Sequence, residues 1–167
     1  AVMRILALNQ KAFEDMEKGL SRLTAPFLKF YHYVRKNTKE GSRKNILAHY
    51  DLGNDFYSMF LDPTMTYSCG IFEREDSTLK EASEAKYDRI CRKLRLGDGD
   101  RVLEIGTGWG GFAVHAARKY DVHVTTTTIS DAQYQFARDR IQADGLEDRI
   151  SLLKKDYRDL DGKFDKL

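Results

Sequence analysis

The 167-residue sequence has few cysteines, no long hydrophobic run and no secretory signal pattern. Its two cysteines, Cys69 and Cys91, cannot form a disulfide framework, so we expect a reducing, cytoplasmic compartment. No segment approaches the roughly 18 consecutive apolar residues of a membrane-spanning helix, and the first ten residues lack a small-residue cleavage pattern. With 41% hydrophobic residues, the chain is also unlike a disordered protein. These features argue against a disulfide-rich, a membrane-spanning and a disordered protein. The length predicts one domain of ordinary size.

Several arrangements of catalytic or metal-binding residues are missing as well. The Ser and His residues form no recognisable nucleophilic triad, and no Cys/His cluster has the spacing of a zinc site. His115 and His123 fall within a predicted helix and strand, so we interpret both as structural. No metal ion is therefore expected.

The small net charge of +2 conceals an asymmetry along the chain. Residues 1–47 carry a net charge of +6 and the remainder carries −4. The basic excess lies mainly in the segment RKNTKEGSRK, which begins at Arg35 and ends at Lys44. This segment is either a solvated linker or an electrostatic site for anionic lipid or phosphate. Nucleic acid is not expected as a partner, because nothing else resembles a groove-reading motif.

The first 96 residues are predicted to form two segments. Residues 1–44 are a basic, helical lead-in with a helix boundary at Pro26, and its aromatic side suits either a core or a membrane. Residues 45–96 combine loops and short helices with a turn at Asp62–Pro63. A capping box, Thr78-x-x-Glu81, then opens a helix to about Leu96. Its predicted apolar stripe, which Lys86 interrupts, consists of Leu79, Ala82, Ile90 and Leu94.

From residue 97 to 167 the pattern changes to alternating strands and helices. Strands are predicted over 101–105, 121–128 and 149–156, and KFDKL at 163–167 begins a fourth. Helices are predicted over 111–120 and from a capping box at Ser130-x-x-Gln133 to Gly145. Such short connections require right-handed parallel crossovers, so the fold class is α/β with a Rossmann-like sheet.

A glycine-rich turn follows the first predicted strand. Gly106, Gly108 and Gly111 match G-x-G-x-x-G between a strand and a helix, which indicates close backbone approach to a ligand. A dinucleotide site expects an acid about 20 residues further on, but Thr125 to Thr128 occupy that place. Glu104 instead precedes the turn, where it can meet the cationic amine of S-adenosylmethionine. An NAD-dependent oxidoreductase remains the alternative.

Several stretches together resemble the cyclopropane-fatty-acyl-phospholipid synthase family. They are the glycine turn with Trp109, TTISDAQ (127–133), AHYDLGNDFYSMFLD and TYSCGIF upstream, and DYRDLDGKFDKL (156–167). The resemblance covers roughly residues 42–167, and HYDLGNDFY and TYSC are more particular to this family than the turn. It implies a class I methyltransferase sheet, of which this chain holds strands 1–4 as the N-terminal portion.

The resemblance implies roles for individual residues. Cys69 would contribute to a catalytic site for a bicarbonate ion, and His49 and Tyr50 would lie on the cofactor or acyl-chain side. The S-adenosylmethionine-binding residues would be Tyr67, Ser68, Glu104, Gly106, Thr107, Gly108, Thr128, Ile129, Gln133, Asp156 and Tyr157. Three of these residues have ordinary alternatives: Gln133 as part of a capping box, Asp156 as a turn residue and Cys69 as a small buried hydrophobe. Thr107 stands where many members carry Cys.

The implied activity is transfer of a methylene or methyl group to the double bond of an unsaturated phospholipid acyl chain, forming a cyclopropane ring. The protein would associate peripherally with an anionic membrane surface, and a homodimer of the full-length protein is left open. Because the family's other bicarbonate ligands follow the fourth strand, we expect the 167-residue chain to be an inactive, poorly stable fragment with an unpaired sheet edge. A methyl-branched product and a non-catalytic S-adenosylmethionine- or lipid-binding module are the alternatives.

Overall fold

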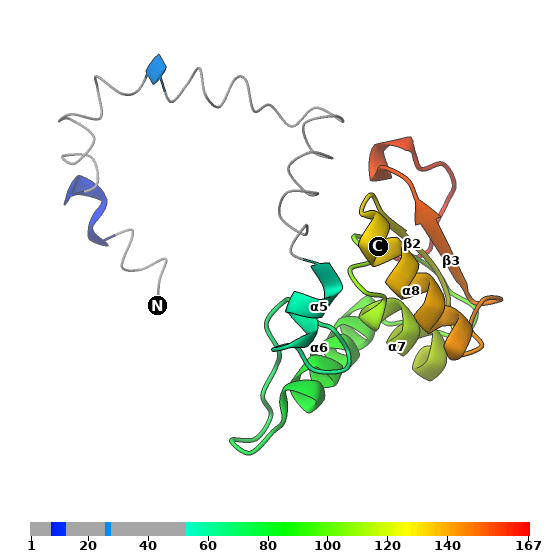
Figure 1. Cartoon of the computed structure of the whole chain (residues 1–167), viewed down its shortest axis with the longest axis horizontal. Helices are drawn as coiled ribbons and strands as arrows, with labels where there is room; N and C mark the ends of the chain where they lie inside the picture. Colours follow the sequence, from blue (N-terminus) through cyan, green and yellow to red (C-terminus); the bar gives the residue numbers. More distant parts are fainter. Residues whose placement is uncertain (1–7, 13–25, 28–52) are drawn as a thin grey trace. The chain divides into compact units, whose positions relative to one another are not determined.

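The computed structural model describes residues 8–12, 26–27 and 53–167. It divides the chain into two units, 1–42 and 43–167, each of which is considered by itself. In the first unit, the described side chains are exposed. The predicted helical lead-in, its basic segment and the boundary at residue 44 otherwise lie outside the described residues. The following description therefore concerns residues 53–167 (Figure 1).

A parallel sheet forms the centre of the second unit, as the sequence predicts. Its strands are β1 (Arg101–Ile105), β2 (His123–Thr128) and β3 (Ile150–Lys154), in the order β1-β2-β3. Helices α7 (Gly111–Tyr120) and α8 (Asp131–Ala143) connect them (Figure 1). The structure thereby confirms the α/β class and the alternation expected from the hydrophobic pattern.

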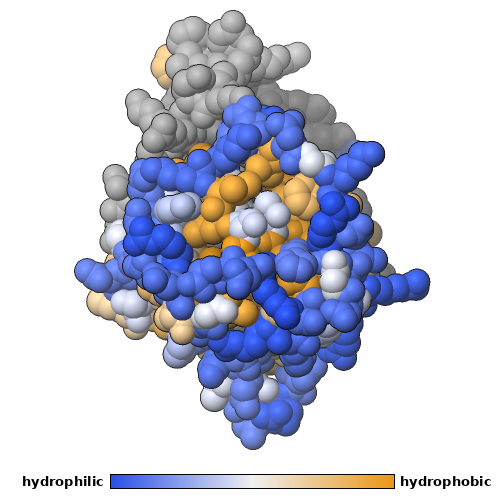
Figure 2. Space-filling view, turned by 90° about the vertical axis from the view of Figure 1, so that its right-hand side faces the viewer, coloured by the Kyte–Doolittle hydropathy of each residue, from blue (hydrophilic) through white to orange (hydrophobic). Residues whose placement is uncertain are grey.

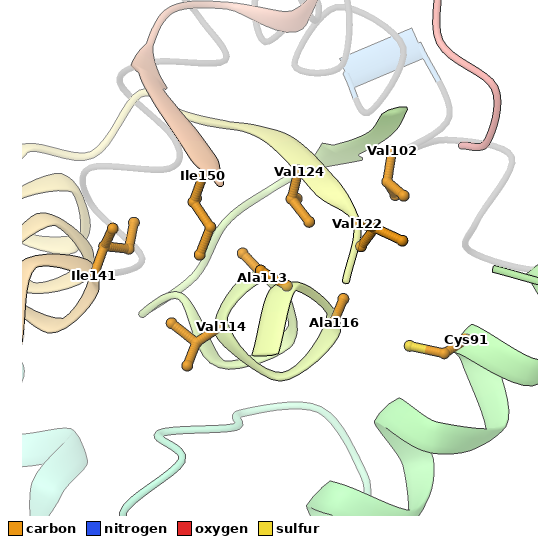
Figure 3. Packing of buried hydrophobic residues seen from close by; sticks show 10 residues of the cluster. Cys91, Val102, Ala113, Val114, Ala116, Val122, Val124, Ile141 and Ile150 are labelled. Atoms are coloured by element: carbon orange, nitrogen blue, oxygen red, sulfur yellow. The ribbon is translucent and has the colours of Figure 1, made fainter. Parts of the chain in front are cut away.

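One face of the sheet carries the main hydrophobic core. Val102, Val124 and Ile150 occupy paired positions on the three strands and pack with residues of α7 and α8, as Figure 3 shows. Each is nearly inaccessible to water, and burial of such a side chain contributes about 1.5–3 kcal/mol. Side chains alternate along a strand, so Leu103 and Ile105 lie on the other face. Ile105 keeps 48% of its surface exposed.

The end of the chain pairs with the free edge of β1. Lys166 forms a parallel bridge with Val102, and the Leu103 amide donates to the Lys166 carbonyl at 2.9 Å. This contact confirms the predicted start of a fourth strand and places it beside β1, on the side away from β2. The edge of β1 is therefore partly covered within this chain.

Helix α6 (Leu79–Leu94) begins with the predicted capping box. The Thr78 hydroxyl accepts from the Glu81 amide at 3.2 Å, and the Glu81 carboxylate accepts from the Thr78 amide at 2.7 Å. The predicted buried stripe is wrong in part, because Leu79 and Ile90 are each 38% exposed. The buried face instead consists of Ala82, Ser83, Tyr87 and Cys91. The residues of α6 that are buried in this unit are three small residues and one tyrosine. The aliphatic side chains of Ile90 and Leu94 instead line a cavity.

A short helix and a loop precede α6. Helix α5 (Gly53–Ser58) buries Tyr57, which packs with Met65 and Trp109. The predicted turn at Asp62–Pro63 is present: the Met65 amide donates to the Asp62 carbonyl at 2.8 Å. The Asp62 carboxylate also accepts from the Thr64 amide at 2.9 Å, as expected of an Asx turn. This segment thus packs over the glycine turn that follows β1.

Candidate cofactor-binding site

A cavity of about 610 Å³ lies at the carboxyl end of β1. This volume falls within the range of small-molecule sites, and the carboxyl end of a parallel strand is where α/β folds bind ligands. Figure 2 shows a hydrophobic hollow with a hydrophilic rim on one side of the protein. The cavity lining includes seven residues that the sequence assigned to the cofactor: Tyr67, Ser68, Glu104, Gly106, Thr107, Gly108 and Gln133.

The glycine turn leaves room for a ligand against the backbone. Gly106 and Gly108 adopt φ values of +95° and +55°, which side-chain-bearing residues rarely reach. A Cβ at either position would stand in open space, so the turn borders the cavity with bare backbone. Gly111 differs: a Cβ there would collide with the Tyr87 hydroxyl and the Thr64 carbonyl oxygen. The third glycine of the motif therefore permits close packing, whereas the first two leave the backbone open towards the cavity.

Glu104 provides the acid of the cavity. Its carboxylate accepts a hydrogen bond of 2.6 Å from the Thr126 hydroxyl. The Thr126 oxygen lies 2.7 Å from the Thr107 hydroxyl, which must donate because the Thr126 proton is already used. Burial raises the pKa of Glu104 to about 8, because a single hydroxyl donor does not replace the lost hydration. Among residues 53–167, no cation pairs with this carboxylate, and a cationic ligand would supply one.

Aromatic side chains form another part of the wall. Trp109 packs on Tyr57 with a ring-centroid separation of 4.9 Å, and Tyr57 meets Tyr67 edge-on at 5.5 Å. The Trp109 indole N–H donates to the Asn54 side chain at 2.7 Å, which ties α5 to the glycine turn. Trp109 and Tyr67 both line the cavity. Aromatic faces of this kind attract cations such as a sulfonium.

Only half of the predicted capping box forms at the start of α8. The Ser130 hydroxyl accepts from the Gln133 amide at 3.4 Å, as expected. The Gln133 side chain does not return to the Ser130 amide; its oxygen accepts from the Thr128 hydroxyl at 3.0 Å. The Ser130 amide instead donates to the Thr128 hydroxyl at 3.2 Å. The Gln133 side chain therefore binds Thr128 at the end of β2 beside the cavity, and it does not complete the capping box.

Other predicted site residues do not line this cavity. Thr128 is buried beneath Gln133, and Ile129 is half-buried. Asp156 caps the short helix η1 (Tyr157–Asp159) and pairs with Arg158, so its turn role is present. Tyr157 is exposed beside it, and the Cys69 thiol is exposed as well, contrary to the alternative of a buried hydrophobe. His49 and Tyr50 lie outside the described residues.

Two polar residues at the site, Thr126 and Lys86, were not among the predicted site residues. Thr126 was noted only as part of a threonine run, although it is the donor to Glu104. Lys86 was noted only as an interruption of an apolar stripe, yet it lines the cavity together with Ile90 and Leu94. The cation that interrupts the apolar stripe was the available signal for Lys86, and no signal within β2 distinguished Thr126 from its neighbours.

These features fit S-adenosylmethionine. The open glycine turn would approach its amino-acid end, Glu104 would meet its ammonium group, and the aromatic wall suits its sulfonium. No acid stands at the end of β2, where Thr125 to Thr128 follow one another, so the site lacks the residue that a dinucleotide requires.

Clusters of metal ligands and membrane-spanning helices are both absent from the part of the chain that the structure describes. There, no group of three or more His, Cys, Asp or Glu residues could hold a metal ion. Across the same residues, none of the helices is both long enough and apolar enough to cross a bilayer.

Comparison with known proteins identifies relatives of the chain. The model of a family described as mycolic acid cyclopropane synthetase matches residues 37–167. A probable fatty acid methyltransferase of Pseudomonas putida is 47% identical over 135 residues, which are 80% of this chain and 34% of that protein. The cyclopropane-fatty-acyl-phospholipid synthase of Escherichia coli K12 is 48% identical over 119 residues, which are 71% and 30% respectively.

Solved structures agree with these sequence matches. The cyclopropane synthase MmaA2 from Mycobacterium tuberculosis superposes with a TM-score of 0.70 and 38% identity, over 73% of this chain and 43% of that one. The mycolic acid cyclopropane synthase CmaA1, complexed with SAH and CTAB, gives a TM-score of 0.70 and 39% identity over the same shares. The chain spans about a third of the length of the curated relatives described above.

Proposed function

Because the chain belongs to the mycolic acid cyclopropane synthetase family, we propose that it supplies the cofactor site of an S-adenosylmethionine-dependent lipid-modifying enzyme. The reaction is transfer of the cofactor's methyl group to the double bond of an unsaturated phospholipid acyl chain with loss of one proton to a base. It yields a cyclopropane fatty acid and S-adenosylhomocysteine. S-adenosylmethionine, when bound, supplies the methyl group as an electrophilic sulfonium. The relatives' names support the reaction class, and the phospholipid substrate is our extension.

The observation that carries this proposal is the position of Glu104 beside the open glycine turn in one cavity. Glu104 binds the cationic end of the cofactor, and the bare backbone at Gly106 and Gly108 permits close contact. Trp109 and Tyr67 exclude water on the aromatic side and stabilise positive charge. These residues bind and orient the cofactor.

Exposed apolar side chains support a lipid substrate. Phe56, Met59 and Phe60, in and just after α5, expose 39%, 75% and 51% of their surfaces. They belong to the same segment as Tyr57, which packs against Trp109 at the cavity. This arrangement suits an acyl chain or a membrane surface next to the site, and the basic segment 35–44 would add attraction to anionic headgroups. We therefore propose peripheral association with the cytoplasmic membrane face.

The bicarbonate assignment remains a prediction. Cys69 is exposed and is not among the residues that line the cavity, although its neighbour Ser68 is. No proton-transfer step is assigned to this thiol.

Binding and turnover test the proposal separately. Calorimetry of the purified protein with S-adenosylhomocysteine and with NAD should show binding of the first alone. Vesicles of unsaturated phosphatidylglycerol are then incubated with methyl-labelled S-adenosylmethionine and a protein of the relatives' length that contains this chain. They should yield labelled fatty acid with the ring identified by mass spectrometry and NMR, whereas the 167 residues alone should give no product. Binding of NAD with no binding of S-adenosylhomocysteine would contradict the proposal, and binding without turnover would favour a non-catalytic module.

A methyl-branched product is the second candidate. The observation in its favour is the printed name of the Pseudomonas putida relative, a probable fatty acid methyltransferase. The same labelled product distinguishes the two reactions: a methyl signal indicates branching, whereas high-field methylene signals indicate a cyclopropane ring.

A further inference from the structure

Lys86 and Glu104 are the basic and the acidic side chain of the cavity. Among the described residues that line it, Lys86 is the single cation and Glu104 the single acid. The remaining lining residues are apolar, aromatic, hydroxyl-bearing, glycine or amide residues. A cavity with one basic and one acidic side chain is suited to a ligand that carries both charges, because a bound ammonium favours the ionised form of Glu104.

The Lys86 ammonium is fixed at the cavity by Ser68. Its Nζ donates to the Ser68 hydroxyl at 2.7 Å and to the Ser68 carbonyl at 3.4 Å. Its Nζ also lies 5.1 Å from the centroid of the Tyr87 ring. An ammonium has three N–H donors, so these two contacts leave capacity for a further acceptor.

No carboxylate neutralises this ammonium directly. Within residues 53–167, Lys86 makes no ion pair with an aspartate or glutamate, whereas Lys80 on the same helix pairs with Glu84. Burial lowers the pKa of Lys86, and the nearby Cys69 and Asp62 only partly oppose that change. Among the described residues, neither the Lys86 ammonium nor the Glu104 carboxylate therefore has an ion-pair partner.

Resting on the proposed function, we infer that Lys86 is the cofactor's carboxylate-binding residue, so that Lys86 and Glu104 together recognise the zwitterionic amino-acid end. Ser68 positions the ammonium, and its own hydroxyl proton can be donated to the same carboxylate, since its oxygen already accepts from Lys86. A ligand without the carboxylate would lose the Lys86 contact and keep the Glu104 contact.

Three ligands separate these contacts by calorimetry on the purified protein. They are S-adenosylhomocysteine, its decarboxylated analogue, and methylthioadenosine, which lacks both charged groups. We expect removal of the carboxylate to weaken binding to the wild-type protein at least about tenfold, as for a charged hydrogen bond. Equal affinity for the first two ligands would overturn the inference without any mutation.

Variants assign the effect to the residue. Lys86→Met should weaken S-adenosylhomocysteine about tenfold and leave the decarboxylated analogue and methylthioadenosine within about twofold. Glu104→Gln should weaken both amine-bearing ligands and spare methylthioadenosine. Lys93→Met, an exposed lysine on the same helix outside the cavity, is the matched control and should change nothing.

The outcomes are distinguishable. If the wild-type protein binds none of the three ligands, the proposed function itself fails. If it binds S-adenosylhomocysteine but Lys86→Met weakens all three ligands equally, Lys86 acts only by shaping the cavity and the inference is wrong. Should Lys86→Met fail to fold, Lys86→Gln and the wild-type ligand series provide the same comparison.

Discussion

Asp88 and Glu104 are two half-buried carboxylates of the same unit, one on α6 and the other on β1. Asp88 accepts hydrogen bonds from Lys119 at 2.6 Å, His115 at 2.8 Å and Tyr120 at 3.2 Å, all on α7. Glu104 accepts from one hydroxyl, that of Thr126.

The two pKa shifts have opposite signs for this reason. Partial burial raises the pKa of Asp88, but the hydrogen bonds from Lys119 and His115 outweigh it and lower the pKa to about 2. Burial dominates at Glu104 and raises its pKa to about 8. Asp88, which pairs with a lysine, joins α6 to α7. Glu104, which has no cationic partner among the described residues, can pair with a cation of a ligand.

Loss of the Asp88 charge should have the largest effect. Asp88→Asn should lower the free energy of unfolding by about 2 kcal/mol at pH 7, because the folded state holds the ionised form. Since its folded pKa lies below the ordinary value, this contribution is present above pH 4 and disappears as the pH falls towards 2. Urea unfolding at pH 7 and pH 3 measures both values.

The exposed Asp139, which pairs with its neighbour Arg138, offers a matched control for that experiment. Asp139→Asn should change stability by less than about 0.5 kcal/mol. Equal losses in the two variants would show that Asp88 is no more than a surface charge.

Loss of the Glu104 charge should act next on ligand binding. Glu104→Gln should weaken S-adenosylhomocysteine about tenfold at pH 8, whereas exposed Glu75→Gln should not. Because a bound ammonium favours the ionised carboxylate, wild-type affinity should rise between pH 6 and pH 8 with release of a proton. Calorimetry in buffers of different ionisation enthalpy detects that proton, and its persistence in Glu104→Gln would exclude Glu104 as the source.

Without ligand, the same substitution should stabilise the protein. The folded pKa of Glu104 exceeds its ordinary value, so its ionisation costs stability as the pH rises from about 4.5 to 8. Glu104→Gln should therefore raise the free energy of unfolding clearly more at pH 8 than at pH 5. Destabilisation at pH 8 would mean that the charge, and not only the shape, of Glu104 supports the fold.

Removal of one donor from Asp88 should have the smallest effect. Lys119 is 55% exposed at its side chain, so Lys119→Met should cost about 0.5 kcal/mol and raise the pKa of Asp88 towards its ordinary value. The pH at which stability is lost on acidification should therefore rise, which urea unfolding between pH 2 and pH 5 measures. An unchanged limb would assign the low pKa of Asp88 to His115 and Tyr120.

Local signals in the sequence were sufficient for much of the fold. The Thr78 capping box, the strand at 101–105, the glycine turn and the following helix each depend on residues within one or two turns of each other. The comparisons confirmed the family resemblance. The resemblance predicted Tyr67, Ser68 and Gln133 as cofactor-binding residues, and the structure places all three in the lining of one cavity.

Other features depended on contacts between distant residues. The apolar stripe of α6 was predicted as Leu79, Ala82, Ile90 and Leu94. The structure buries Ala82, but the rest of its buried face consists of Ser83, Tyr87 and Cys91. Lys86 meets Ser68 across 18 residues, and Thr126 meets Glu104 across 22. The periodicity of a single helix or strand does not predict such contacts, because they depend on how the elements pack against each other.

The sequence by itself determined the alternation of strands and helices, the glycine turn and the presence of an acid before it. These depend on backbone geometry and side-chain periodicity, which are local. Only the tertiary structure decided which carboxylate has a cation and which does not. That difference depends on desolvation and on donors from other elements, and both exist only once α6, α7 and the sheet are packed together.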